Sequence, residues 1–477
     1  MDATRIQQLV QEVMTRLEQP EPGAAAQVPR GTVRLEGRAA FSDLDAAVAA
    51  SAAAGPAMRA LGLQWRRKAI GAVREASRQA WRMLAEMAVE ETGFGRVSDK
   101  ITKNSIVTEL TPGPEDVEPA VYSGDHGLTL IERAPFGVIG SITPSTNPSE
   151  TVINNSISML SGGNTVVFAP HPAAEKVSLK AIEIVDRAVV EAGGPPNTVV
   201  GLSQGSLQKT EALMRHPGIR LLVVTGGPGV VKAAMNSGKR AVCAGPGNPP
   251  VVVDATANIE RAGRDIVAGA SIDNNIICTA EKECFVVASV ADQLKAAMVQ
   301  AGAFELKPYL LSKLESLIFE RTRGPRKHAD MNRKFIGKDA NVFLRALGLE
   351  PEKDHRLVMV EVPADHPLVW SEQLMPVFPV VRLPDVDACI RMAVEAEHGF
   401  RHTACMHSRD VEKLSDMARA VDCSIFVKNG PNFAGLGFGG EGPTSFTIST
   451  PTGEGLTTAR TFTRIRRCTL VDSFRIV

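Results

Sequence analysis

The chain has 477 residues and carries 53 basic and 53 acidic side chains, so its formal net charge is zero. This balance gives no electrostatic reason to expect nucleic acid or an anionic membrane as a partner. No apolar run approaches the roughly 20 residues that span a bilayer, and no basic region followed by an apolar one marks a secretory signal. The seven cysteines show no C-x-x-C spacing, which argues against a metal site or a disulfide framework and favours a reducing, cytosol-like compartment.

The N-terminal segment is predicted to form a separate amphipathic helix on a tether. Its apolar residues recur at helical spacing and make one stripe, which consists of Ile6, Leu9, Val10, Val13, Met14 and Leu17. The following residues are rich in proline, glycine and alanine, which is typical of a flexible linker. We expect a helix over 1–19 and a linker over 20–35. From the residues alone two roles stay open: the helix packs on its own domain, or it docks on a partner.

From about residue 40 the chain alternates between helical and strand patterns. The expected helices are 43–60, 66–90 and 177–192, and the expected strands of this first region are 137–142, 164–168 and 221–225. A second such region has expected strands at 249–254, 285–287, 358–362, 380–382 and 424–427. Apolar strands separated by helices favour a parallel sheet that is covered on both faces. The sequence therefore predicts an α/β fold with two doubly wound parallel-sheet domains.

Two residues suggest chemistry at a carbonyl group. Cys278 follows a polar Asp-Asn-Asn turn and a short apolar step, and charged residues resume at Glu281, so we expect its thiol at the floor of a pocket. Most cysteines are small buried apolar residues, and Cys284, which opens an apolar strand, fits that description. Asn147 lies on a proline-flanked loop, where asparagine alone is typical of a turn. A thiol nucleophile with an amide donor for an oxyanion is the minimum for such chemistry.

A glycine turn follows one of the predicted strands. Thr225 ends the strand, and Gly226, Gly227 and Gly229 follow before a helical segment begins. A strand, a glycine turn and a helix form a phosphate-binding arrangement, because the N–H groups and the dipole of the helix meet at the turn. The spacing is not G-x-G-x-x-G, so a plain turn remains an equal alternative on spacing alone.

Together these segments resemble the aldehyde dehydrogenase superfamily, and within it the CoA-acylating aldehyde dehydrogenases of bacterial microcompartments. Residues 142–148 match the family's oxyanion loop, 163–174 its first cofactor strand and loop, and 223–229 its glycine turn. Residues 245–253 and 274–278 match the acylating branch. The resemblance implies that Cys278 is the nucleophile, that Asn147 binds the oxyanion, and that the second oxyanion donor is the backbone N–H of Cys278.

The resemblance also implies NAD as cofactor and CoA as co-substrate. The residues expected to contact the cofactor are Thr143, Pro144, Ala169, Pro170, His171, Thr225, Gly226, Gly227, Gly229 and Glu372. Glu372 matches the glutamate that hydrogen-bonds the nicotinamide ribose. The run from Gly435 to Gly442 is expected either near the cofactor or CoA, or in a mobile turn.

Two departures from the family pattern bear on the reaction. Cys243 stands where hydrolytic aldehyde dehydrogenases have a glutamate that activates water. Without that base water attacks a thioester slowly, whereas a CoA thiol, with a pKa near ~8.5, needs less activation. Ala169 stands where many relatives place a lysine on the adenosine ribose, which argues against NADP and leaves room for CoA.

We therefore predict an enzyme that oxidises acetaldehyde or propionaldehyde to acyl-CoA. The alternatives are a hydrolytic aldehyde or semialdehyde dehydrogenase that releases free acid, and a non-catalytic microcompartment scaffold. The resemblance implies a cytoplasmic location within a bacterial microcompartment, contacts of residues 1–19 with shell or cargo proteins, and a homo-oligomer. The expected domains are an NAD/CoA-binding domain at 36–241 with oligomerisation strands near 122–134, a catalytic domain at 242–440, and a C-terminal segment at 441–477 with a further oligomerisation strand.

Overall fold

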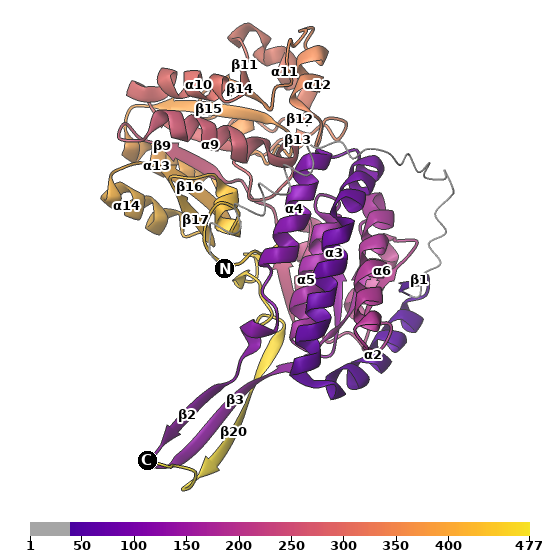
Figure 1. Ribbon diagram of the computed structural model, residues 1–477. Helices are drawn as coiled ribbons and strands as arrows, with labels where there is room; N and C mark the ends of the chain where they lie inside the picture. The colour runs from indigo at the N-terminus through magenta and orange to yellow at the C-terminus, as the bar shows by residue number, and fades with distance from the viewer. Residues whose placement is uncertain (1–38) are drawn as a thin grey trace, which may run out of the picture.

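The computed structural model describes residues 39–477 and consists of two α/β lobes and a projecting β arm (Figure 1). The predicted helix at 1–19 and linker at 20–35 lie outside the described residues. No single helix in the described part of the chain is long and apolar enough to cross a membrane, although helices α2 and α3, which meet at a bend of 118°, satisfy the length and composition criteria together.

The first lobe is built on a six-stranded parallel sheet with the order β1-β6-β5-β4-β7-β8. Its strands are β1 (Ala40–Phe41), β4 (Val138–Ile142), β5 (Thr165–Ala169), β6 (Val199–Leu202), β7 (Leu221–Thr225) and β8 (Ala241–Ala244). The inner strands β4, β5 and β6 are buried throughout, which agrees with their continuous apolar sequences.

Helices cover both faces of this sheet. They are α2 (Leu44–Ala60), α3 (Gly62–Thr92), α4 (Val97–Leu110), α5 (Pro148–Ser161), α6 (Glu175–Glu191), α7 (Leu207–Arg215) and α8 (Pro228–Met235). Alternate strand residues divide between two apolar clusters: Val223 and Val242 join the side with α3, α5 and α6, whereas Val224 and Cys243 join the side with α2, α7 and α8. This two-sided burial is the doubly wound arrangement that the sequence predicts.

The second lobe contains a seven-stranded parallel sheet with the order β11-β14-β15-β10-β9-β16-β17. Its strands are β9 (Pro250–Val253), β10 (Glu283–Val287), β11 (Ala303–Glu305), β14 (Leu357–Glu361), β15 (Val377–Leu383), β16 (Thr403–His407) and β17 (Ile425–Lys428). Its helices are α9 (Ile259–Ser271), α10 (Ala291–Gln300), α11 (Leu311–Ile318), α12 (Ala340–Ala346), α13 (Val386–Ala396) and α14 (Val411–Val421). Two short antiparallel pairs complete the strands: β12 (Phe319–Arg321) with β13 (Asp330–Met331), and β18 (Ile448–Ser449) with β19 (Gly455–Leu456).

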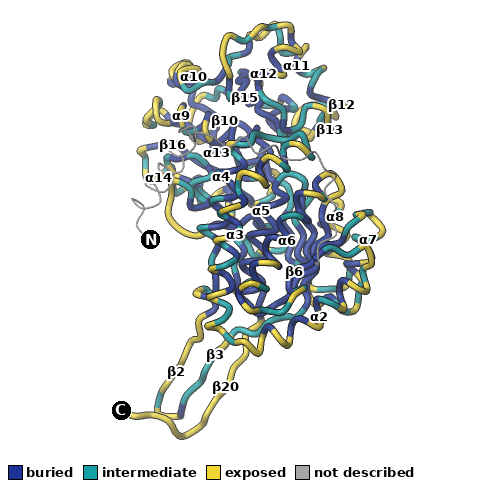
Figure 2. Tube along the Cα trace, turned by 45° about the vertical axis from the view of Figure 1, so that its right-hand side comes forward, coloured by how far each residue is buried: buried dark blue, intermediate teal, exposed yellow. Residues whose placement is uncertain are grey.

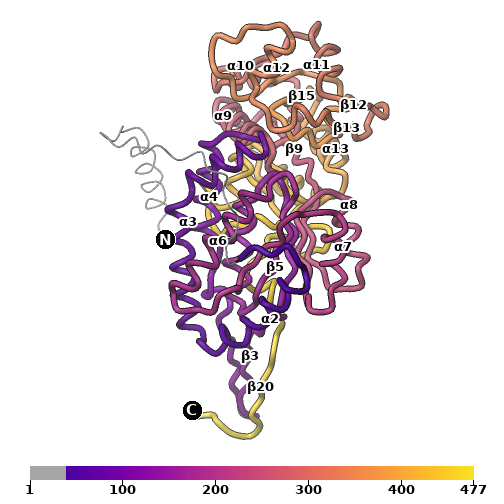
Figure 3. The backbone as a smooth tube through the Cα atoms, turned by 90° about the vertical axis from the view of Figure 1, so that its right-hand side faces the viewer, coloured from indigo at the N-terminus to yellow at the C-terminus, as the bar shows by residue number. Residues whose placement is uncertain are grey.

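The arm is a three-stranded antiparallel sheet that extends away from the first lobe (Figures 1 and 3). It is formed by β2 (Ala120–Gly124), β3 (Gly127–Pro135) and the C-terminal β20 (Thr463–Val471), with β3 in the centre. Figure 2 shows that most of the arm is exposed, in contrast to the dark, buried strands of the lobes. Tyr122, Ile465 and Val471 are each more than 60% exposed. These strands include the segments expected to make oligomer contacts.

The element boundaries follow the sequence patterns closely. The helix expected at 66–90 extends over Gly62–Thr92, and the one expected at 177–192 extends over Glu175–Glu191. The first sheet ends with β8, and the second begins with β9 six residues later. The predicted fold class, two doubly wound parallel sheets with a small additional β element, is confirmed.

Candidate active site

A cavity of about 490 Å³ lies where the carboxyl ends of the first sheet face the second lobe. The last residues of four parallel strands line it, namely Ile142 of β4, Ala169 of β5, Thr225 of β7 and Ala244 of β8. The second lobe contributes Ile276, Cys278, Glu372 and Leu374. Ligands in open α/β sheets bind outside the carboxyl ends of the strands, so this cavity is the candidate active site.

The structure brings nearly all the predicted site residues together at this cavity. Its lining includes Cys278, Asn147, Thr143, Pro144, Ala169, Pro170, His171, Thr225, Gly226, Gly227 and Glu372. Gly229 is not among the lining residues, although its neighbours Pro228 and Val230 in the first turn of α8 are. The glycine run that begins at Gly435 lines a different hollow of about 680 Å³, next to β17 and α9.

The segment before Cys278 has an unusual backbone. Asp273, Asn274 and Asn275 all have positive φ angles, of 48°, 54° and 66°. Such left-handed conformations are tolerated best by asparagine and aspartate, and several in a row persist only where surrounding contacts hold them. The Asn274 amide donates to Gly337 O and Asp339 Oδ1, and the Asn275 amide donates to Ala270 O and Glu281 O. These bonds account for the polar turn in the sequence.

This turn leaves Cys278 partly exposed at the cavity, whereas Cys284 is fully buried on β10. Within the described residues the backbone N–H of Cys278 donates to no oxygen, so it is free to act as a donor. Burial, followed by the charge of Glu372, raises the pKa of the Cys278 thiol to about 12, while Lys282 and Lys103 act in the opposite direction. The thiol is therefore protonated at neutral pH and needs help to ionise.

Lys282 is fully buried and is not the solvated surface residue that its charged neighbours in the sequence suggest. Its Nζ donates to Asn275 O at 2.7 Å and to Asn275 Oδ1 at 2.6 Å, and it also reaches Ile277 O. Burial lowers the pKa of Lys282 to about 8, against the opposing charges of Glu372 and Cys278. Lys282 thus fixes the loop that presents the thiol and provides a cation near it.

Asn147 ends the loop after β4 and precedes Pro148, the first residue of α5. It is 5% exposed and lies at the cavity wall. Its Oδ1 accepts a hydrogen bond from Lys103 Nζ at 2.7 Å, and its Nδ2 donates to Thr146 Oγ1 at 3.2 Å. The carbonyl end of the amide is therefore occupied by a cation, and the N–H₂ end is the one left to meet a substrate oxygen.

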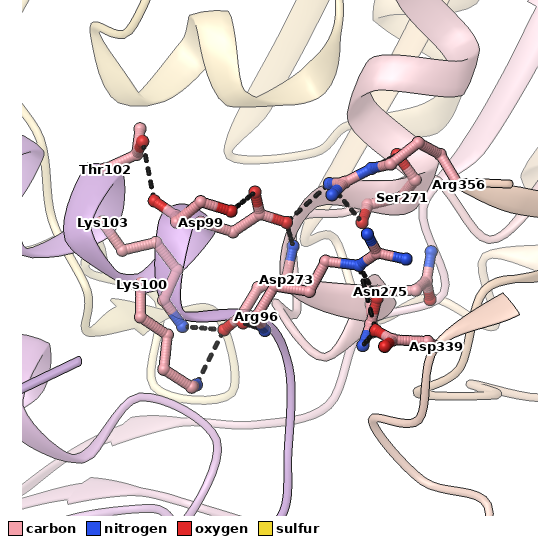
Figure 4. A network of polar contacts seen from close by, with 12 residues as sticks. Arg96, Asp99, Lys100, Thr102, Lys103, Ser271, Asp273, Asn275, Asp339 and Arg356 are labelled. Atoms are coloured by element: carbon pink, nitrogen blue, oxygen red, sulfur yellow. Dashed lines mark hydrogen bonds and ion pairs between the residues drawn. The ribbon is translucent and has the colours of Figure 1, made fainter. Parts of the chain in front are cut away.

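A buried charge cluster connects Asn147 to the turn before Cys278, and Figure 4 shows its Lys100, Lys103 and Asp273. Lys100 and Lys103 extend from α4 toward the Asp273 carboxylate, and Lys103 also forms an ion pair with Glu150. All four side chains are fully buried. The sequence analysis did not identify this cluster, because its lysines and Asp273 are 170 residues or more apart and only the fold brings them together.

The wall formed by the first lobe fits a dinucleotide. The glycine turn lies between β7 and the start of α8, and a Cβ atom built on Gly227 or Gly229 would meet nothing within 4 Å. The Thr143 hydroxyl lines the cavity and is buried with no hydrogen-bond partner among the described residues. Open backbone at a helix start and an unsatisfied hydroxyl are suited to a phosphate and ribose ligand.

The position of Cys243 separates it from the cavity. Its side chain is fully buried in the apolar cluster that also contains Ile142 and Val224, and burial raises the pKa of its thiol to about 11, with the charge of Glu454 adding to the effect. The next residue, Ala244, lines the cavity instead. Glu372 is the only carboxylate among the described lining residues, and burial raises its pKa as well.

One buried histidine near the cysteine loop was also missed by the sequence analysis. His402 is fully buried, its Nδ1 contacts Thr403 Oγ1 at 2.8 Å, and its Nε2 has no partner in the described part of the chain. A Cβ at Gly247 would lie 2.8 Å from Cys278 O and 3.0 Å from His402 Cγ, so glycine is required there for the close approach of both groups. Nothing in the local sequence pattern signals this contact.

Comparison with known proteins gives this site its context. A model described as the aldehyde dehydrogenase family matches residues 27–307. The acetylating acetaldehyde dehydrogenase EutE of Salmonella typhimurium is 49% identical over the full length of both chains. A Rhodopseudomonas palustris propionaldehyde dehydrogenase, solved with bound CoA and an acylated cysteine, is 46% identical and superposes with a TM-score of 0.88 over 91% of this chain and 98% of its own.

A third relative comes from a microcompartment. It is the propionaldehyde dehydrogenase of the Clostridium phytofermentans fucose utilisation bacterial microcompartment, which is 44% identical and has a TM-score of 0.89 over 92% of this chain and all of its own. Both the family match and the full-length identities agree with the resemblance seen in the sequence. The chain therefore belongs to the aldehyde dehydrogenase family, in the branch of the CoA-acylating enzymes.

Proposed function

We propose that this protein oxidises a short-chain aldehyde, acetaldehyde or propionaldehyde, and transfers the acyl group to CoA, with NAD as the oxidant. The observation that carries the proposal is one cavity in which a partly exposed cysteine, a cation-bound amide and an open glycine turn meet. The relatives with this activity and with an acylated cysteine support it.

The first chemical step uses Cys278 and Asn147. The Cys278 thiolate attacks the carbonyl carbon of the aldehyde, and the carbonyl oxygen gains a negative charge. The amide of Asn147 and the backbone N–H of Cys278 stabilise this oxygen; one such preorganised donor is worth about 3 kcal/mol. The charge of Lys282 lowers the pKa of the thiol more than that of Lys103 does, and so favours the thiolate.

The second half of the reaction transfers the acyl group. NAD, when bound, supplies the hydride acceptor. Oxidation leaves a thioester on Cys278, and the CoA thiolate attacks its carbon, so that the new C–S bond forms as the bond to Cys278 breaks. Thr143, the glycine turn and Glu372 are the residues that would hold the dinucleotide, with Glu372 at the nicotinamide ribose.

Two observations favour CoA over water as the acyl acceptor. Cys243, where hydrolytic relatives carry their base, is a buried thiol in an apolar cluster, and Glu372 is the only carboxylate among the described residues that line the cavity. A thioester without a positioned base is attacked slowly by water, whereas a thiol ionises readily near neutral pH. The hydrolytic alternative therefore lacks its catalytic group.

The proposal is tested with matched cysteine variants and by omission of CoA. We expect Cys278→Ala to abolish NADH formation with acetaldehyde or propionaldehyde, and Cys284→Ala to keep most of it, because Cys284 lies inside β10. Without CoA, turnover should stop near one equivalent of NADH per subunit. Sustained NADH release without CoA would establish the hydrolytic alternative, and no NADH release at all would favour the scaffold. Rates for C2 to C4 aldehydes then identify the preferred substrate.

We also propose that the enzyme is cargo of a bacterial microcompartment and is targeted by residues 1–19. The relative from the fucose utilisation microcompartment and the apolar stripe of that segment support this. Deletion of residues 1–19 should leave aldehyde oxidation in solution nearly unchanged and remove the enzyme from the compartment. A fluorescent protein fused to residues 1–19 should enter it. If that fusion stays diffuse while the truncated enzyme still enters, the segment is not the targeting element.

The homo-oligomer is proposed to form through the arm. Its strands expose apolar side chains such as Ile465 and Val471 and project away from the lobes, where a second copy can cover them. Light scattering should give a mass above that of one 50.9 kDa chain, and Ile465→Glu should reduce it. A wild-type protein that remains a monomer at micromolar concentration would contradict this assignment.

A further inference from the structure

We propose that Lys103 is a positioning residue for the reaction: its ammonium group fixes the Asn147 amide in the orientation that presents Nδ2 to the substrate oxygen, and its bond to Asp273 ties this amide to the segment that carries Cys278. The proposal rests on the proposed function, since it requires Asn147 to be the oxyanion donor.

The first step of the argument is the geometry around Lys103 Nζ. The group is fully buried and donates to Asn147 Oδ1 at 2.7 Å, to Asp273 Oδ2, and more weakly to Thr146 O at 3.3 Å, with Glu150 Oε1 at 3.2 Å. An ammonium group has donors only, and an amide has a donor end and an acceptor end. If the amide were reversed, its N–H₂ group would face the ammonium group in a buried site, where two donors cannot satisfy each other. The cation therefore permits one orientation.

The second step is that Lys103 remains charged. Burial alone lowers its pKa, but the carboxylates of Asp273 and Glu150 outweigh burial, so that the pKa of Lys103 is raised. Lys100 binds the same Asp273 carboxylate at 2.9 Å, yet burial lowers its pKa overall. The cation that contacts Asn147 is thus the one that two carboxylates stabilise.

The third step connects the amide to the nucleophile. Asp273 lies five residues before Cys278, and its left-handed backbone is held by bonds from both sides: Asp273 N donates to Asp99 Oδ2 at 2.8 Å, and Arg96 N donates to Asp273 Oδ1 at 3.0 Å. A Cβ at Gly95 would lie 1.7 Å from Asp273 Oδ1, so the chain has glycine at this close approach. Helix α4 therefore joins the two lobes through Asp273, next to the start of the cysteine loop.

The fourth step concerns donor strength. A hydrogen bond from a cation to the amide oxygen draws electron density away from the amide nitrogen, so the N–H groups become stronger donors, and chains of such bonds reinforce one another in a low-dielectric site. Lys103 thus acts on Asn147 in two ways, by orientation and by polarisation. The partners of Lys103 are Thr146, Asn147, Asp273 and Glu150, and none of them is a residue proposed to hold the dinucleotide.

The test is a double-mutant cycle with a matched lysine. Lys103→Met removes the ammonium group that contacts Asn147. Lys100→Met removes an equally buried ammonium group from the same carboxylate without touching Asn147. We expect Asn147→Ala to lower kcat about 100-fold. Lys103→Met should lower kcat about 10-fold with little change in KM for NAD or CoA, and it should add nothing in the Asn147→Ala background, because both changes remove the same interaction.

The control should behave differently. Lys100→Met should lower the melting temperature at least as much as Lys103→Met, change kcat less than about twofold, and multiply with the effect of Asn147→Ala. If Lys103→Met does not fold, the same cycle is made with Lys103→Gln and Lys100→Gln. Glutamine at 103 retains one N–H donor for Asn147 Oδ1, so we expect about a threefold loss of kcat that again disappears in the Asn147→Ala background.

Three outcomes overturn the proposal. In the first, the losses from Lys103→Met and Asn147→Ala multiply, which means that Lys103 acts elsewhere. In the second, Lys100→Met costs as much kcat as Lys103→Met, which means that only the integrity of the cluster matters. In the third, Lys103→Met keeps the wild-type kcat while Asn147→Ala is slow. A wild-type rate for Asn147→Ala itself is distinct, because it overturns the role of Asn147 in the proposed function and the Lys103 proposal with it.

Discussion

Two fully buried lysines with opposite surroundings act on the charge of the Cys278 thiol. Lys103 of α4, in the first lobe, contacts two carboxylates, which outweigh burial and raise its pKa. Lys282, in the second lobe, donates to neutral oxygens of Asn275 and Ile277, so burial prevails and lowers its pKa to about 8. Both lysine side chains are fully buried, so burial does not distinguish them. The charges of their partners decide which of the two stays protonated throughout the neutral pH range.

The nearby carboxylates show the same contrast. Asp273 lies between Lys100 and Lys103, which outweigh burial and lower its pKa. Glu281 accepts a hydrogen bond from the Asn432 backbone N–H at 2.7 Å, but burial dominates and raises its pKa to about 8. The side of the cysteine loop that meets the first lobe is therefore a fixed set of charges, and the side inside the second lobe is titratable near neutral pH. Four variants test this division.

The largest loss of stability is expected from a variant that buries a carboxylate without any cation to pair with it. Cys243→Glu places it in the apolar cluster beside Ile142 and Val224, and the nearby charge that acts on Cys243 is the negative Glu454. Since an uncompensated buried charge costs about 3–5 kcal/mol, we expect a large drop in the midpoint of urea unfolding. The ratio of free acid to acyl-CoA should not rise. A stable variant that releases acid without CoA would show that this side chain reaches the cavity as it does in hydrolytic relatives.

Lys282→Met should have the next largest effect, on the reactivity of the thiol. It removes the cation that most favours the Cys278 thiolate and leaves Asn275 O and Oδ1 without their donor. Each pKa unit of thiolate stabilisation that is lost lowers the alkylation rate at pH 7.5 about tenfold, so we expect labelling to slow by about that factor. Iodoacetamide labelling of Cys278, followed by mass spectrometry, measures it. Lys103→Met is the control and should slow labelling much less; the reverse order would contradict the division of roles between the two lysines.

Much of the fold could be predicted because its signals are local. The continuous apolar strands and the helices between them predict two parallel sheets, and the structure has both. The polar turn before Cys278 and the apolar residues after Cys284 correctly separate a cysteine at the cavity from one inside a strand. The catalytic roles of Cys278, Asn147 and Glu372 remain predictions, since position at the cavity does not by itself establish a role.

The features of the site that could not be predicted depend on contacts between residues far apart in the sequence. Lys103 and Asp273 are 170 residues apart, and a lysine on a helix that also carries Asp99 and Lys100 has the pattern of a solvated face. Lys282 follows Glu281 and precedes Glu283, which likewise suggests a surface, yet all three are fully buried. Gly229 was expected to contact the cofactor, but the cavity is lined by its neighbours Pro228 and Val230 and not by Gly229. Charged residues in a sequence usually predict an exposed segment. At this site they are buried instead, because charges of opposite sign pair with one another inside the protein.

Glu281→Gln tests the titratable side through the pH dependence of stability. The folded carboxyl keeps its proton up to a pKa of about 8, whereas the unfolded one ionises near 4.5, so the folded state binds more protons between these values and wild-type stability falls as pH rises from 4.5 to 8. Glutamine does not titrate and keeps the acceptor for Asn432 N. We expect Glu281→Gln to gain about 3 kcal/mol over wild type between pH 5 and pH 8, in urea unfolding. An equal offset at both values would mean that Glu281 ionises normally.

Glu372→Gln should change thiol labelling and aldehyde turnover in opposite directions. The Glu372 carboxylate lines the cavity with Cys278 and raises the pKa of that thiol, so removal of the charge should speed iodoacetamide labelling about threefold to tenfold near neutral pH. If Glu372 also holds the nicotinamide ribose, the same variant should raise KM for NAD and lower aldehyde turnover. Faster labelling together with slower turnover would assign Glu372 to cofactor binding, at some cost in thiol reactivity. Slower labelling would mean that the charge of Glu372 does not raise the pKa of Cys278, which would leave burial as the cause of the raised thiol pKa.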